Sequence, residues 1–145
     1  MLEYFSKNTA ITLGAVGVES IVPFSNQHLL KGCGTAMSGN SLQINKCGIY
    51  DIDCDLSFSA DIASTLTFTL YVDGVAQPQT VSSETITAAD NSRSVHLSTY
   101  VTKQDNNCRC NPCTAPTNIY LTVSSSVADT VVTFDTTNIK AYKVA

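Results

Sequence analysis

Apolar and polar residues alternate along many segments of the chain, most regularly across residues 48–60. Turn-forming residues separate these segments, and no segment carries apolar residues at helical spacing. Because successive side chains of a strand point to opposite faces, each segment has one apolar and one polar face. These observations predict an all-β protein: a sandwich of two antiparallel sheets with about ten strands.

The first third of the chain is expected to contain an arm and two strands. Residues 1–9 are polar and are expected to form an N-terminal arm, with a single domain over residues 10–145. A first strand is predicted over 11–24, where glycines and Pro23 favour an edge position. An irregular segment over 25–39 and a short strand over 40–44 follow.

The longest strand is expected over residues 48–60, and the next over 65–72. Asp73-Gly74 predicts a tight hairpin turn after it, because both residues can adopt positive φ. A loop rich in Asn, Cys and Pro is expected over 103–117. The remaining strands are predicted at 80–87, 95–102, 119–123, 131–134 and 139–144.

Length and charge exclude several classes of function. The 145 residues suffice for one domain with a core. The net charge is −4 and the eight Lys and Arg residues are dispersed, so no basic patch for nucleic acid is expected. No apolar run is long enough for a membrane span, and the first residues do not resemble a signal peptide. The protein is therefore expected to stay in the cytoplasm where it is made.

Six cysteines occur, and they fall into different surroundings. Cys54 lies on the apolar face of the longest strand and is expected in the core. Three others share a six-residue stretch of one loop, where they could converge on zinc or form a disulfide. The C-x-x-C spacing also suggests redox chemistry, but the helix that such motifs need is not predicted. The candidates for a metal site or a disulfide are Cys47, Cys108, Cys110 and Cys113, and free thiols remain an alternative.

Acidic residues line the polar face of the longest strand. Asp51, Asp53 and Asp55 are spaced about 7 Å apart, so one cation could meet two of them but not all three. A solvated surface or a surface facing another subunit is therefore favoured. No nucleophile elbow, phosphate-binding loop or zinc-protease motif occurs. The sequence predicts a protein that is not an enzyme and has no cofactor, apart from a structural metal at the cysteine loop.

Six stretches together have a familiar pattern: Met1–Ser6, Gly32–Gly34, Asn45–Gly48, Tyr71–Pro78, Cys108–Cys113 and Asn138–Ala145. They resemble the small jelly-roll proteins of phages and prophages of Gram-positive gut bacteria. Those proteins are similar in form to the jelly roll of tumour necrosis factor and the complement globular head. Family members often carry Arg on the polar face where this chain carries Asp.

The resemblance implies a homotrimer in which one sheet of each subunit faces the three-fold axis. The strand over 48–60 would lie between the strand over 94–103 and the C-terminal strand, antiparallel to both. Cys47 would then lie near the cysteine loop. The implied trimer interface comprises Asp51, Asp53, Asp55, His96, Tyr100, Lys140 and Tyr142.

The resemblance also implies a function. The chain is expected to be a virion structural protein, a capsid decoration or head-fibre protein, assembled in the host cytoplasm. Its partners would be its own copies and the major capsid protein or another virion protein, with residues 1–9 as a docking arm. The alternative is a receptor- or carbohydrate-binding tip module of a tail fibre or cell-surface appendage. That function predicts aromatic platforms on loops, whereas most Tyr and Phe residues lie in predicted strands.

Overall fold

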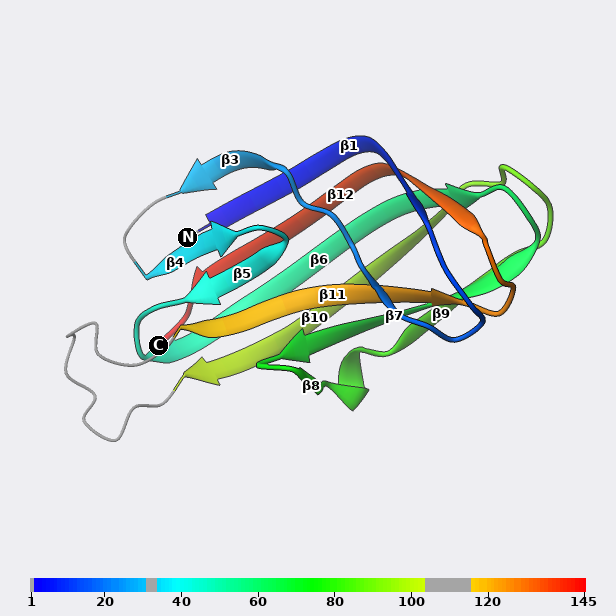
Figure 1. Ribbon diagram of the computed structural model, residues 1–145. Helices are drawn as coiled ribbons and strands as arrows, with labels where there is room; N and C mark the ends of the chain where they lie inside the picture. The colour runs from blue at the N-terminus through cyan, green and yellow to red at the C-terminus, as the bar shows by residue number, and fades with distance from the viewer. Residues whose placement is uncertain (1, 31–33, 104–115) are drawn as a thin grey trace.

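The computed structural model describes residues 2–30, 34–103 and 116–145, with the side chains of residues 6–8 and 27–29 left out. In these ranges the chain forms twelve strands and one short 3-10 helix. The strands make two antiparallel sheets that lie face to face, as Figure 1 shows. The predicted all-β sandwich is confirmed, and none of the described residues belongs to a helix long and apolar enough to cross a membrane.

Sheet A is the five-stranded layer and contains the longest strands. The strand β6 lies between β10 and β12 and is antiparallel to both, which confirms the arrangement that the resemblance implied. In spatial order the sheet contains β10 (Arg93–Lys103), β6 (Gly48–Ala60), β12 (Val131–Lys143), β1 (Leu2–Thr12) and β3 (Asn26–Leu30).

Sheet B is the seven-stranded layer and is built mainly of shorter strands. Its central strand β11 pairs with β5 and β2 along one edge and with β7 along the other. In spatial order the sheet contains β4 (Thr35–Ser38), β5 (Ser41–Ile44), β11 (Thr117–Ser125), β7 (Ser64–Val72) and β8 (Val75–Ala76), with β2 (Ser20–Ile21) beside β11 and β9 (Ser82–Ile86) beside β7.

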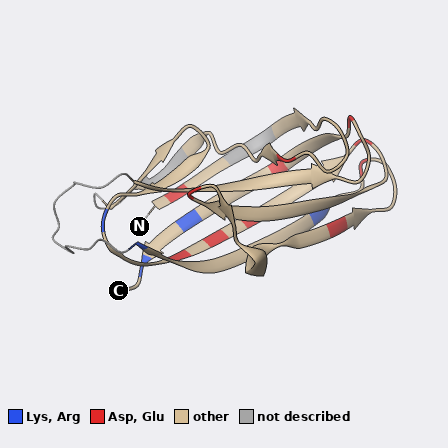
Figure 2. Cartoon of the chain, turned by 60° about the horizontal axis from the view of Figure 1, so that its bottom comes forward, with Lys and Arg blue, Asp and Glu red and all other residues tan. Residues whose placement is uncertain are grey.

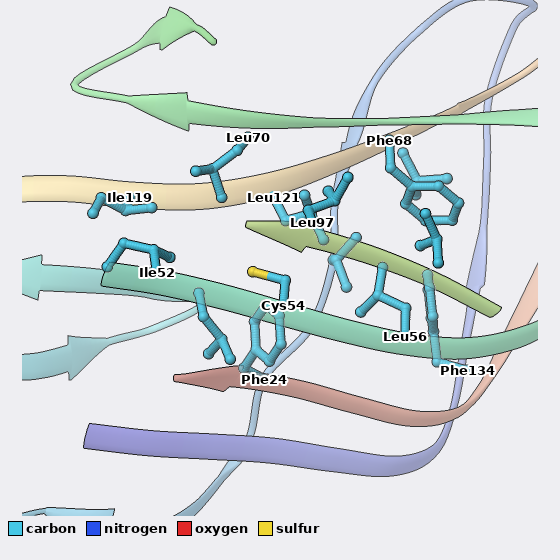
Figure 3. Packing of buried hydrophobic residues seen from close by; sticks show 14 of the residues in the cluster. Phe24, Ile52, Cys54, Leu56, Phe68, Leu70, Leu97, Ile119, Leu121 and Phe134 are labelled. Atoms are coloured by element: carbon cyan, nitrogen blue, oxygen red, sulfur yellow. The ribbon is translucent and has the colours of Figure 1, made fainter. Parts of the chain in front are cut away.

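The core lies between the sheets, where the apolar faces of the strands meet (Figure 3). Phe58 of β6 is at its aromatic centre, with ring centroids 4.9 Å from Phe68 and 6.4 Å from Phe134. All three rings are fully buried. Burying a side chain of this size contributes roughly 1.5–3 kcal/mol. Because every second residue of β6 is buried between the sheets, this strand contributes several such side chains to the packing of one sheet on the other.

The hairpin predicted at Asp73-Gly74 is present between β7 and β8. Both residues have positive φ, 50° and 79°. The Asp73 carboxylate accepts a hydrogen bond from the Asn118 backbone N–H at 2.8 Å, and the Asp73 N–H donates to the Asn118 carbonyl at the same distance. These two bonds tie the turn to β11 and offset the strain of a non-glycine residue with positive φ.

The N-terminal arm expected over residues 1–9 is not a separate segment where the structure describes it. From Leu2 onward these residues form β1, which pairs with β12 from Leu2 opposite Ala141 to Thr12 opposite Val131. Leu2 is fully buried. The polar residues in the middle of this segment hid its strand pattern, but the backbone ladder to β12 does not depend on side-chain polarity. The first strand therefore lies at 2–12 and not at 11–24.

Other strand boundaries also differ from the prediction. β12 is one continuous strand where two were expected, and a register shift between Phe134 and Thr136 accommodates one extra residue. The segment 25–39, expected to be irregular, contains β3 and β4. The strand expected from residue 80 begins after the 3-10 helix η1 (Pro78–Thr80).

Candidate interaction surface

The outer face of sheet A gathers all seven residues that were predicted to form an interface. The register places each aspartate of β6 between one residue of β10 and one of β12. In Figure 2, acidic bands recur along the long strands of this sheet. Three rows cross the sheet: His96–Asp55–Asn138, Ser98–Asp53–Lys140 and Tyr100–Asp51–Tyr142.

His96 lies against two of the aspartates. Its Nδ1 is 2.6 Å from Asp55 Oδ1, and its Nε2 is 3.7 Å from Asp53 Oδ1. The side chains are 57% exposed for His96, 56% for Asp55 and 37% for Asp53. At this exposure a contact between polar side chains, charged or neutral, contributes at most about 1 kcal/mol to stability. The contacts therefore fix the positions of these side chains on the surface and add little to the stability of the fold.

A second polar contact joins β12 to β1 on the same face. The Asn138 side-chain N–H donates to Glu3 Oε1 at 2.8 Å, and Glu3 lies opposite Lys140 in the register. The side-chain oxygen of Asn138 is buried and has no hydrogen-bond partner among the described residues. A covered polar atom without a partner costs about 1–3 kcal/mol. This site was missed from the sequence because residues 1–9 were not assigned to a strand and so to a face.

Two tyrosines protrude from this face. Tyr100 of β10 is 68% exposed and Tyr142 of β12 is 55% exposed, with Asp51 between their backbones. Ile49 is 38% exposed and has the same phase as Asp51 on β6. Its position in the alternation could have identified it from the sequence. Exposed aromatic residues on one face of a sheet are a feature of interaction surfaces.

The structure describes only some of the cysteines for which predictions were made. Cys47 is half-buried and adjoins Gly48, which pairs with Lys103 at the end of β10. Cys47 therefore lies at the end of sheet A where β10 ends. Whether it lies near the cysteine-rich stretch, as the resemblance implied, stays a prediction. Cys108, Cys110 and Cys113 lie outside the described residues. Among the residues that are described, no three His, Cys, Asp or Glu side chains form a metal-binding group.

Next to Cys47, the Tyr50 side chain closes this end of the sandwich. Its hydroxyl donates to the Lys46 carbonyl at 2.9 Å, and its ring is buried. Burial, followed by the neighbouring Cys47, raises the pKa of Tyr50. The hydroxyl therefore stays protonated and keeps donating at neutral pH.

The chain matches no protein-family model and no curated protein sequence. Solved structures nevertheless share its fold. Murine APRIL, in a crystal structure at pH 5.0, has a TM-score of 0.53 and 14% identity over 96% of this chain and 98% of that chain. The fold is thus a tumour-necrosis-factor-like jelly-roll sandwich.

Two viral structures share the fold as well. A chain of the T13 IBDV viral particle has a TM-score of 0.56 and 12% identity, covering 97% of this chain and 31% of that chain. The PRD1 vertex protein P5 has a TM-score of 0.53 and 12% identity, covering 99% and 96% of the two chains. Identities this low show a common fold and do not carry function across.

Proposed function

We propose that this chain is a non-enzymatic structural protein of a virion: a homotrimeric capsid decoration or head-fibre protein of a bacteriophage. The likeness in fold to proteins of the IBDV particle and the PRD1 vertex supports a virion location. The proposed source, a phage or prophage of Gram-positive gut bacteria, and the three-fold order come from the family resemblance. The role needs no catalytic residue and no cofactor. Its partners are further copies of the chain and the major capsid protein or another virion protein.

The observation that carries the proposal is the outer face of sheet A. Tyr100 and Tyr142 expose large aromatic surfaces there beside a row of carboxylates. Contacts between subunits are enriched in tyrosine, so two exposed tyrosines that flank β6 on one face favour a contact there. A second copy covering this face would remove that apolar surface from water and so gain binding free energy.

The charges of the same face are arranged to limit repulsion between copies. In a trimer the aspartates of β6 occur three times near one axis, and these negative charges would repel each other. In each protomer, however, Lys140 lies opposite Asp53 and His96 lies against Asp55. A contact of this face with a neighbouring copy can thus pair donors and acceptors that are both present on it.

The oligomeric state tests the interface. Native mass spectrometry of the purified chain should give three times the 15.5 kDa chain mass. Tyr142→Glu should reduce this to one chain, because it places a charge on the contact face. Val75→Glu is the matched control, since Val75 is 63% exposed and lies on sheet B. A wild-type monomer, or a trimer that survives Tyr142→Glu, would contradict the proposed contact.

The virion role needs a separate test. Labelled protein is mixed either with phage heads emptied of DNA or with host cells, and both are sedimented. Co-sedimentation with heads at a fixed stoichiometry is expected. Binding to cells with no binding to heads would overturn the capsid role and favour a receptor-binding tip.

A further inference from the structure

An open groove lies on the outer face of sheet B, on the opposite side of the sandwich from the proposed contact face. Its volume is about 500 Å³, which is within the range of small-molecule sites. It runs beside the β7–β8 turn and over β4, β5 and β11. The residues that line it are Ser38, Ser41, Gln43, Asp73, Gly74, Asn118 and Tyr120.

The polar side chains of the groove hold one another in place. Gln43 and Asn118 are opposite each other in the register of β5 and β11, and the Gln43 side-chain N–H donates to Asn118 Oδ1 at 3.2 Å. Asp73 is fixed in turn by its hydrogen bond from the Asn118 backbone. Binding groups that are already ordered lose little conformational entropy when a ligand arrives.

An aromatic pair forms one wall. The Tyr120 ring stacks on the Tyr71 ring, with centroids 5.2 Å apart and planes within 5°. The Tyr71 hydroxyl donates to the Glu19 carboxylate, and this bond raises the pKa of Tyr71, so the hydroxyl remains a donor. Tyr71 belongs to β7, whereas the groove extends toward β5 on the other side of β11. Of the stacked pair, Tyr120 lines the groove and Tyr71 does not, so Tyr120 is the ring that a ligand can meet.

The chemistry of the lining selects a class of ligand. The residues offer hydroxyl groups, two amides, one carboxylate and one aromatic face, and no cation. An anion would meet the Asp73 carboxylate without a compensating charge, and an apolar molecule would find little apolar lining. A sugar ring fits, because its hydroxyls pair with amides and carboxylates while its C–H groups pack on the negative face of an aromatic ring. We propose that this groove binds a neutral saccharide, with Tyr120 as the stacking residue and Gln43, Asp73 and Asn118 as hydrogen-bonding residues.

This inference goes beyond the structural role and does not depend on the trimer. The groove is on sheet B and the proposed contact is on sheet A, so the groove stays accessible in either oligomeric state. Its aromatic platform comes from strand faces and not from loops. The position of Tyr and Phe residues in strands is therefore no argument against saccharide binding by this chain.

Saturation-transfer difference NMR tests the site, with maltose, lactose and chitobiose as separate probes. Transfer to the ring C–H protons of at least one probe is expected. Tyr120→Ala should lower that transfer about tenfold and Gln43→Ala about fivefold, while Tyr120→Phe keeps the ring and should retain it. Gln79→Ala is the matched control, because Gln79 is an exposed amide outside the groove.

Three outcomes would overturn the inference. These are no transfer to any of the three probes, transfer that is unchanged in Gln43→Ala, or sialyllactose bound more strongly than lactose, which would indicate an anion site. Circular dichroism of each variant shows whether it is folded. If Tyr120→Ala does not fold, Gln43→Ala and Tyr120→Phe decide between the outcomes.

Discussion

Cys54 is a buried thiol whose two neighbours in the chain are surface carboxylates. Its side chain is 1% exposed and points into the core, as its neighbours in Figure 3 show. Asp53 and Asp55, its chain neighbours, belong to the opposite face. Burial raises the pKa of the Cys54 thiol far above its usual range, and the two carboxylates add to the effect. The thiol therefore stays protonated in the folded protein.

This shift predicts a loss of stability at alkaline pH. In the unfolded chain Cys54 ionises above about pH 8.5, whereas in the folded chain it cannot, so the unfolded state binds fewer protons there. The free energy of unfolding should fall by about 2 kcal/mol between pH 8.5 and pH 10 through this residue. Urea unfolding of the reduced protein measures it, and Cys54→Val should lack that part of the decrease. Equal decreases in the two proteins would contradict the prediction.

The position of Cys54 could be predicted from the sequence, but other residues of the surface could not. The alternation along β6 assigns each of its residues to a face, including the aspartates. The partners of those aspartates depend on which strands lie beside β6, and for these the resemblance supplied the answer. Glu3 and Asn138 are 135 residues apart in sequence, and no local pattern indicates the contact between them.

At the scale of elements, the backbone at the start of β6 packs closely against residues 143–145. Gly48 has φ +149, and a Cβ at this position would lie 2.6 Å from the Ala145 carbonyl oxygen and 2.5 Å from Lys143 Cε. The Ile49 backbone N–H donates to that same carbonyl at 3.1 Å, and the Val144 N–H donates to the Ile49 carbonyl at 2.9 Å. The glycine thus allows the C-terminal segment to pack against β6.

Replacing Gly48 should separate the start of β6 from residues 143–145. Gly48→Ala should lower the free energy of unfolding by about 1–3 kcal/mol, because the new side chain is strained and meets backbone. It should also speed hydrogen exchange at Ile49 and Val144. Gly14→Ala is the control, since a Cβ there meets nothing within 4 Å and its backbone has no positive φ, and it should change stability little. Identical effects of the two substitutions would contradict this account.

Strand existence was easier to predict than strand ends. β6, β7, β10 and β11 have regular alternation with buried apolar faces, and each was expected close to where it lies. β1 and the middle of β12 are polar and were assigned to an arm and a gap. They are strands because neighbouring strands satisfy their backbone groups: β12 pairs along β1, and both β1 and β6 pair along β12. This is a tertiary effect that local patterning does not encode.

At the scale of the whole molecule, the two sheets present different outer faces. Sheet A exposes tyrosines and charges over its long central strands, whereas sheet B exposes a polar groove beside a hairpin. If the proposed contact on sheet A holds, the groove on sheet B stays available while sheet A is covered. A single small domain can in this way combine assembly with recognition.

If folding and trimer assembly are linked, stability must depend on protein concentration. The melting temperature of the wild-type chain should rise with protein concentration in differential scanning calorimetry. That of Tyr142→Glu should not, since the variant is expected to be monomeric. A wild-type melting temperature that is independent of concentration would show that the fold does not need the contact.

The place of β12 sets the order in which this protein can mature during synthesis. Among the described strands it is the last in sequence, yet it lies between β1 and β6 and pairs with both. Until it emerges, sheet A exists only as two separate halves with unpaired edges, which are sites for aggregation. A nascent chain that stalls before residue 131 therefore exposes both edges at once, and the addition of β12 is the step that completes sheet A.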